Sequence, residues 1–214
     1  MDVWAAVDEE RSALAEDLSG LRDEQWDQQS LCEQWKVRHV VAHLVVGTKM
    51  TASQMAAGVL RNGLRLDRYL ANDALDAGAA APEVLLDQFR HTIGSQQLPP
   101  LTKPACLLAD VVCHSADIRR PLGLSRIVPK ASLIGAADFL RSDFTSGTKK
   151  RIAGLHLSAT DVAWSVGDGP EIEGPMDALV LAMAGRPSAI GELDGPGLPT
   201  LQVRVEPSRH ADRH

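Results

Sequence analysis

The chain has 214 residues, of which 44% are hydrophobic and 23% charged, so its composition is that of a folded globular protein. A formal net charge of -6 argues against a general nucleic-acid binder, which needs a basic surface. The longest apolar run, residues 40–46, is far shorter than the ~20 residues of a membrane helix. Three cysteines without a CxxC pair favour a reduced compartment. We therefore expect a cytoplasmic protein that binds neither nucleic acid nor membrane.

Apolar residues recur at helical spacing through the first two thirds of the chain. Asp2 is a suitable N-cap for the first such segment, and Pro82 and Pro104 stand where helices begin. The predicted helices cover 1–21, 37–60, 65–77, 82–93, 104–120 and 130–140. Short connections between them predict a helical bundle over residues 1–145.

The pattern changes after Ser142. Two short runs, 155–160 and 162–166, alternate between apolar and polar residues and precede a Gly-Asp-Gly-Pro turn, which predicts a pair of strands. A helix over 175–185 and a last strand over 200–205 follow. The sequence thus predicts a mainly α protein with a small C-terminal α/β segment over 146–206 and a disordered tail over 207–214.

Two predicted helices carry a histidine within an apolar run, His43 and His114. Asp110 precedes His114 by four residues, so the two side chains share one helix face. A carboxylate and an imidazole at this spacing commonly supply two ligands of a catalytic metal, and His43 is the natural third donor from a facing helix. The competing interpretation is a structural bundle with two hydrogen-bonded core histidines.

Two segments then point to a family. Residues 30–44, SLCEQWKVRHVVAHL, and residues 108–123, LADVVCHSADIRRPLG, resemble the signatures of the mycothiol-dependent maleylpyruvate isomerase family. Residues 159–164 and 185–187 resemble its C-terminal segment. The resemblance implies a DinB-like four-helix bundle that holds a divalent metal, typically zinc, through His43, Asp110 and His114. It also implies mycothiol as the thiol cosubstrate.

The chain departs from this family at one ligand position, because characterised isomerases carry glutamate where it has Asp110. A shorter carboxylate reaches less far from its helix, so Asp117, three residues after His114, is the alternative third ligand. The competing interpretation of Asp117 is an ion pair with Arg119 or Arg120 near the helix end.

Arg186, in a Gly-Arg-Pro turn, is the candidate catalytic residue, since its planar guanidinium can bind a substrate carboxylate. An arginine just past a helix end can equally serve the helix dipole. The leading hypothesis is a metal-dependent isomerase or transferase that joins mycothiol, or a similar small thiol, to an electrophilic substrate. The alternative is a non-catalytic metal- or small-molecule-binding protein with a stress or regulatory role. The oligomeric state stays open, a homodimer included.

Overall fold

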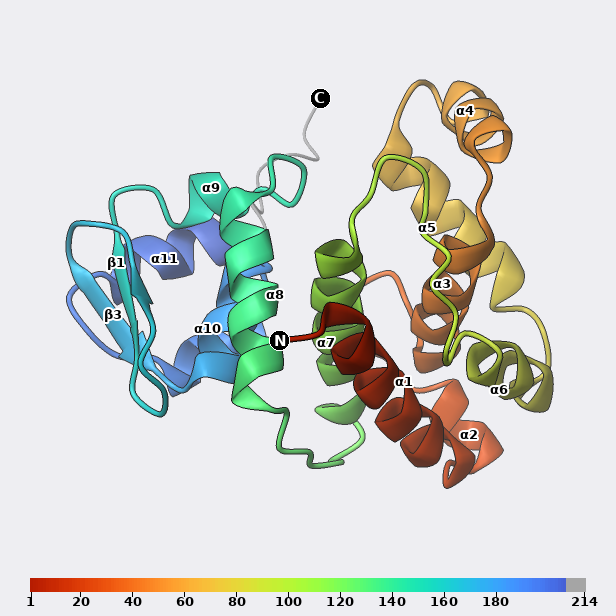
Figure 1. The fold of residues 1–214 in the computed structure, drawn as a ribbon, viewed down its shortest axis with the longest axis horizontal. Helices are drawn as coiled ribbons and strands as arrows, with labels where there is room; N and C mark the ends of the chain where they lie inside the picture. Colours follow the sequence, from red (N-terminus) through yellow and green to blue (C-terminus); the bar gives the residue numbers. More distant parts are fainter. Residues whose placement is uncertain (207–214) are drawn as a thin grey trace. The chain divides into compact units, whose positions relative to one another are not determined.

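The computed structural model describes residues 1–206, and the predicted tail, residues 207–214, lies outside the described residues. The chain divides into two compact units, Met1–Ile127 and Val128–His214. None of the described helices is long and apolar enough to cross a membrane. Figure 1 shows that the first unit consists of helices, whereas the second combines helices with strands.

The first unit is built on a four-helix bundle. Helix α1 packs against α6 and α7, and α3 packs against the same two helices. Their apolar faces meet in one core, to which Leu14, Val41, Phe89 and Ile118 contribute. The mainly helical class and the bundle predicted from the sequence are confirmed. The helices of this unit are α1 (Val3–Ser19), α2 (Asp23–Trp26), α3 (Val37–Lys49), α4 (Ala52–Arg61), α5 (Leu66–Ala77), α6 (Pro82–Arg90) and α7 (Pro104–Arg119).

The predicted helix over 37–60 is wrong in its extent, because the helix is interrupted between α3 and α4. Met50 has extended backbone, with φ -67° and ψ 125°. Thr51 then caps α4: the Gln54 backbone N–H donates to Thr51 Oγ1 at 3.3 Å, and the Thr51 backbone N–H donates to Gln54 Oε1 at 2.9 Å. This reciprocal pair is a capping box. The interruption could not be predicted from periodicity, because the apolar spacing continues across it. The Thr-x-x-Gln pattern nevertheless marks the start of α4.

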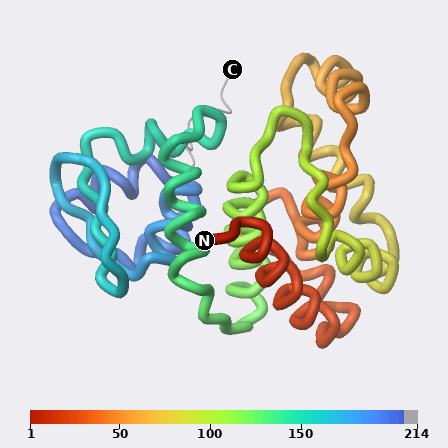
Figure 2. The backbone as a smooth tube through the Cα atoms, in the orientation of Figure 1, coloured from red at the N-terminus to blue at the C-terminus, as the bar shows by residue number. Residues whose placement is uncertain are grey.

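The connection from α6 to α7 is fixed to α1 by hydrogen bonds, which matters because α7 carries two of the candidate ligands. In Figure 2 residues 94–103 run alongside the bundle without helical turns. Arg11 Nη1 donates to the carbonyls of Thr92 at 2.7 Å and Ser95 at 3.1 Å, and the Gly94 backbone N–H donates to Asp8 Oδ1 at 2.9 Å. Pro104 then begins α7.

Buried charges also join α7 and the segment after it to α1. Glu10 is fully buried and accepts from Arg126 Nε at 3.1 Å and Nη2 at 2.9 Å. Arg119 Nε donates to Asp17 Oδ2 at 2.5 Å, and its Nη1 lies 3.9 Å from Glu10 Oε2. Because a buried charge needs a partner, these pairs fix how α7 lies on α1.

The second unit places a small sheet beside helices. The order of the strands is β2-β1-β3, with β1 antiparallel to β2 and parallel to β3. The predicted pair of strands is confirmed, whereas β3 was not predicted. The elements are α8 (Lys130–Ser142), α9 (Thr148–Arg151), β1 (His156–Ala159), β2 (Ser165–Val166), β3 (Glu171–Gly174), α10 (Met176–Met183), a 3₁₀ helix (Pro187–Glu192) and α11 (Leu198–Val205).

Two expectations differ from this structure. The division between units falls before α8 rather than at residue 145, because the apolar face of α8 packs on the buried helix α10. Residues 200–205 were predicted as a strand, which is wrong, since they belong to α11. Leu201 and Val205 are its buried residues, four apart, and Pro199 stands in its first turn. Six residues are too few to separate a short helix from a short strand by periodicity alone.

Candidate metal centre

Helices α3 and α7 pack together and bring the three predicted ligands to one point. Asp110 Oδ1 lies 3.6 Å from His43 Nε2 and 3.4 Å from His114 Nε2. One donor atom from each residue lies within 4.8 Å of the other two. Ligands that stand about 2.1 Å from a tetrahedral zinc ion lie about 3.4 Å from one another. The three side chains therefore have the donor types and the separation that a divalent metal requires.

The second ring nitrogen of His114 explains the role of Asp117. Nδ1 of His114 lies 2.9 Å from Asp117 Oδ2, and the side chain of Asp117 is 0% exposed. A carboxylate accepts, so the Nδ1 proton lies in this bond and the lone pair of Nε2 faces Asp110. A histidine that binds a metal is usually oriented by such a carboxylate behind it. This geometry favours Asp110 as the third donor and Asp117 as the group that orients His114.

A segment between α2 and α3, residues 29–36, covers this site. Gln29 Nε2 donates to the carbonyls of Cys32 and Trp35, both at 2.8 Å, and so closes the segment on itself. The Cys32 thiol donates to Asp117 Oδ2 at 3.2 Å, and the Leu31 backbone N–H donates to the Asp117 carbonyl at 3.0 Å. Cys32, His114 and Asp117 form a second group of metal-ligand types. It uses Nδ1 of His114, which the Asp117 carboxylate already holds.

The Trp35 ring packs against both candidate histidines, tilted by 37° to His43 and by 42° to His114. Its centroid is 4.9 Å from that of His43 and 5.9 Å from that of His114. The two imidazoles meet edge to face, with centroids 4.9 Å apart. The sequence alone does not predict Trp35 as part of the site. Helical spacing from His43 could not have placed it there, because α3 begins at Val37 and the backbone of Lys36 is extended.

A positive charge reaches the carboxylate of Asp110 from α1. Burial lowers the pKa of the Arg11 guanidinium, while the charges of Asp8 and Asp110 raise it. Arg11 therefore lies within electrostatic range of Asp110, and its cationic form favours the ionised carboxylate that a metal ligand must be.

Arg186 lies in the second unit, directly after α10. Its Nη1 donates to the Ala184 carbonyl at 2.8 Å and its backbone N–H donates to the Leu181 carbonyl at 2.9 Å. Burial, and then the charge of Arg186, lower the pKa of Arg151, which itself donates to the Met183 carbonyl at 2.8 Å. Both arginines thus bind carbonyls at the end of α10, where the helix dipole favours cations. A catalytic role for Arg186 stays a prediction.

Comparison with known proteins finds a domain family that most of the first unit resembles. Residues 7–98 match the family model of the mycothiol maleylpyruvate isomerase N-terminal domain. His43 lies within this match, whereas Asp110 and His114 lie beyond it. No curated protein matches the chain by sequence.

Two solved structures have the same fold. The crystal structure of the mycothiol-dependent maleylpyruvate isomerase is 15% identical, with a TM-score of 0.64 over 91% of this chain and 92% of that one. A histidine-to-alanine mutant of that enzyme is also 15% identical, with a TM-score of 0.63 over the same shares. The family resemblance predicted from the sequence is confirmed. Residues 7–98, less than half of the chain, are similar to the mycothiol maleylpyruvate isomerase N-terminal domain family.

Proposed function

We propose that this protein is a cytoplasmic, metal-dependent isomerase or transferase that uses mycothiol or a similar low-molecular-weight thiol. Its partners would be that thiol and an electrophilic small molecule. The observation that carries the proposal is the meeting of His43, Asp110 and His114, with Asp117 behind His114. The family and the isomerase that shares the fold support the thiol and the reaction type.

Zinc is the metal we propose. Two imidazoles and one carboxylate form a common catalytic zinc set, which leaves one coordination position for water or substrate. Sites of this composition also accept other divalent ions, so metal analysis has to accompany every assay. Asp110 is 33% exposed, more than either histidine at 16% and 11%, which keeps one side of the donor set open to a small molecule.

Several residues around the three proposed ligands would orient them and shield them from water. Asp117 holds the imidazole of His114 in one orientation, and Cys32 and Leu31 hold Asp117. Trp35 packs against both histidine rings and would restrict the access of water from that side. Arg11 favours the anionic form of Asp110. A bound divalent ion would supply a Lewis acid that keeps a coordinated thiol deprotonated.

Arg186 is the residue we propose to bind a carboxylate of the substrate. A guanidinium can hold a carboxylate through two parallel hydrogen bonds. The family's C-terminal Gly-Arg-Pro pattern supports this role, and the bonds of Arg186 to α10 are the structural alternative. Arg186→Gln should then raise KM for an acidic substrate and leave zinc content unchanged.

One experiment tests the proposed function as a whole. The purified protein is analysed for metal and then assayed for adduct formation between mycothiol and an unsaturated acid, with and without a chelator. We expect about one zinc per chain and a rate that falls when the metal is removed and returns when zinc is restored. Metal without thiol chemistry would instead indicate a non-catalytic binding protein with a stress or regulatory role. Absence of any divalent metal would leave a structural bundle with two core histidines.

A further inference from the structure

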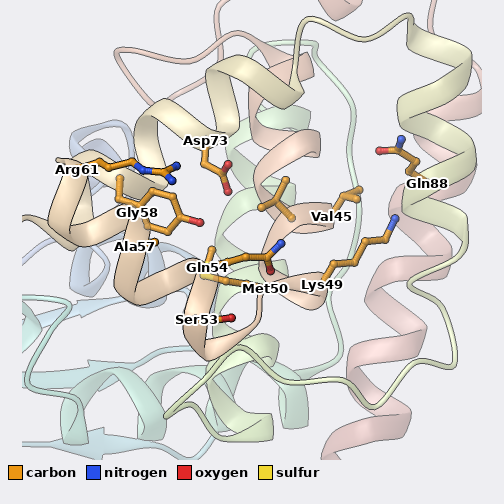
Figure 3. Close-up of a pocket in the computed structure, with 12 residues that line it drawn as sticks. Val45, Lys49, Met50, Ser53, Gln54, Ala57, Gly58, Arg61, Asp73 and Gln88 are labelled. Carbon is orange, nitrogen blue, oxygen red and sulfur yellow. The ribbon is translucent and has the colours of Figure 1, made fainter.

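A hollow of about 660 Å³ lies in the first unit among α3, α4, α5 and α6 (Figure 3). Pockets of this size commonly bind small molecules. Its apolar lining includes Val45, Met50 and Ala57, and polar side chains such as Ser53 and Gln54 line it as well. The hollow forms where α3 ends before Met50 and the chain turns to begin α4 in a new direction.

The hollow adjoins the candidate metal centre along α3. Val46 and Met50, which line the hollow, follow His43 by three and seven residues, so they continue the helix face on which His43 lies. Asp73 of α5 also lines the hollow. Burial and then the charge of Asp76 raise the pKa of Asp73, and His43 opposes that shift, which puts Asp73 within electrostatic range of His43.

Two cations reach the hollow without a partner of opposite charge. Lys49 and Arg61 both line it, and within residues 1–206 neither forms an ion pair or a hydrogen bond through its side chain. Arg38 and Arg65, by contrast, pair with Asp27 and Asp67. In a chain of net charge -6, two unpaired cations around one hollow produce a local positive potential.

The first turn of α4 adds to this positive potential, and Asp73 reduces it in the middle of the hollow. Ser53 and Gln54 belong to the first turn of α4, where the helix dipole is positive. Burial and then the charge of Asp73 raise the pKa of Tyr69, and Arg61 opposes that shift, so Arg61 and Asp73 both lie near the phenol. Figure 3 shows Arg61 and Lys49 on opposite sides, with Asp73 between them. A ligand should therefore present anionic groups to the cations and an uncharged polar part to Asp73.

We propose that this hollow binds the carboxylates of a small organic acid, and that Lys49 and Arg61 select for it. The proposal rests on the proposed function, because the acid would be the electrophilic substrate held beside the metal centre. It differs from the role of Arg186, because it assigns substrate recognition to the first unit. Lysine and arginine both bind carboxylates through charge-assisted hydrogen bonds.

Succinate is the probe, and its uncharged diamide, succinamide, is the matched comparison. Binding is measured by calorimetry on the zinc-loaded full chain and on Lys49→Gln, Arg61→Gln and the control Arg68→Gln. Arg68 lies exposed on α5 and does not line the hollow. Each hollow variant should bind succinate about tenfold more weakly, as loss of a charged hydrogen bond implies, and Arg68→Gln should match the wild type. Zinc content should be the same in all four proteins.

Equal succinate affinity in all four proteins would overturn the proposal, as would binding of succinamide as tight as that of succinate. Inorganic phosphate that binds as tightly as succinate would overturn the assignment to carboxylates. The same titrations on chelator-treated protein separate this proposal from the proposed function. The protein could hold no zinc while Lys49→Gln and Arg61→Gln still weaken succinate binding. That result would support the binding site in the hollow and contradict the proposed metal-dependent activity.

Discussion

Around His114, polar side chains bond to one another: the Cys32 thiol and the His114 imidazole both donate to the buried carboxylate of Asp117. Around the hollow beneath α4, Lys49 and Arg61 line the same space without ion pairs among the described residues. The first arrangement uses its hydrogen bonds to hold the protein's own groups in place. In the second, Lys49 and Arg61 form no such bonds among the described residues, and they are the groups we propose to bind a ligand. The polar groups of the candidate metal centre and those of the hollow thus differ in whether they bond to other groups of the protein.

The largest effect should follow removal of a histidine. His43→Ala or His114→Ala removes one of three donors, so we expect each to abolish stoichiometric zinc binding, measured by mass spectrometry after dialysis. His91→Ala is the control, because His91 is exposed and its imidazole bonds to Asp87 on α6. Full zinc content in His114→Ala would contradict the metal centre.

A graded effect should separate the two aspartates. Asp110→Ala should weaken zinc affinity most, because it removes a ligand, and Asp110→Glu should be tolerated, because the longer carboxylate can still reach the ion. Asp117→Asn should cost about 10–100-fold, as loss of a group that orients a ligand usually does. Zinc titrations against a competing chelator would measure all three. The reverse order would make Asp117 the ligand.

A change in the hollow should affect stability without touching the metal. A Cβ on Gly58 would lie 2.3 Å from Cε2 of the Tyr69 ring, so Gly58→Ala should displace that ring. We expect a loss of about 1–3 kcal/mol in the free energy of unfolding, measured by urea denaturation. Gly47→Ala on α3 is the control, since its Cβ would meet nothing within 4 Å. If both variants were equally stable, the close packing of α4 on α5 would be in doubt.

The smallest effect should come from Cys32. Cys32→Ala removes one thiol hydrogen bond to Asp117, which should weaken zinc binding by about 2–10-fold. Cys32→Ser keeps a donor at nearly the same place and should restore most of that loss. The comparison needs zinc affinities and thermal unfolding of the metal-free proteins, because a purely structural role would lower stability without changing zinc affinity. An unchanged zinc affinity in Cys32→Ala would show that Asp117 positions His114 without help from Cys32.

Much of the candidate site could be predicted because its signal is local. The four-residue spacing of Asp110 and His114 puts them on one helix face whatever surrounds the helix. The sequence could not predict which ring nitrogen of His114 each aspartate faces. Asp110 lies four residues before His114 and Asp117 three residues after it, so both lie near the same helix face. The structure distinguishes them, because Asp117 is buried against Nδ1 of His114 and residues 29–36, whereas Asp110 faces Nε2.

The sequence by itself determined the helical class, the start of most helices and the three candidate ligands, because periodicity, caps and motif spacing act over a few residues. Only the tertiary structure decided that α8 packs on α10, that residues 198–205 form a helix, and that Trp35 covers His43. It also brought Lys49 and Arg61 to one hollow. The physical reason is that an apolar face or an unpaired charge does not specify its partner. That partner is chosen when distant segments pack and bury their surfaces together.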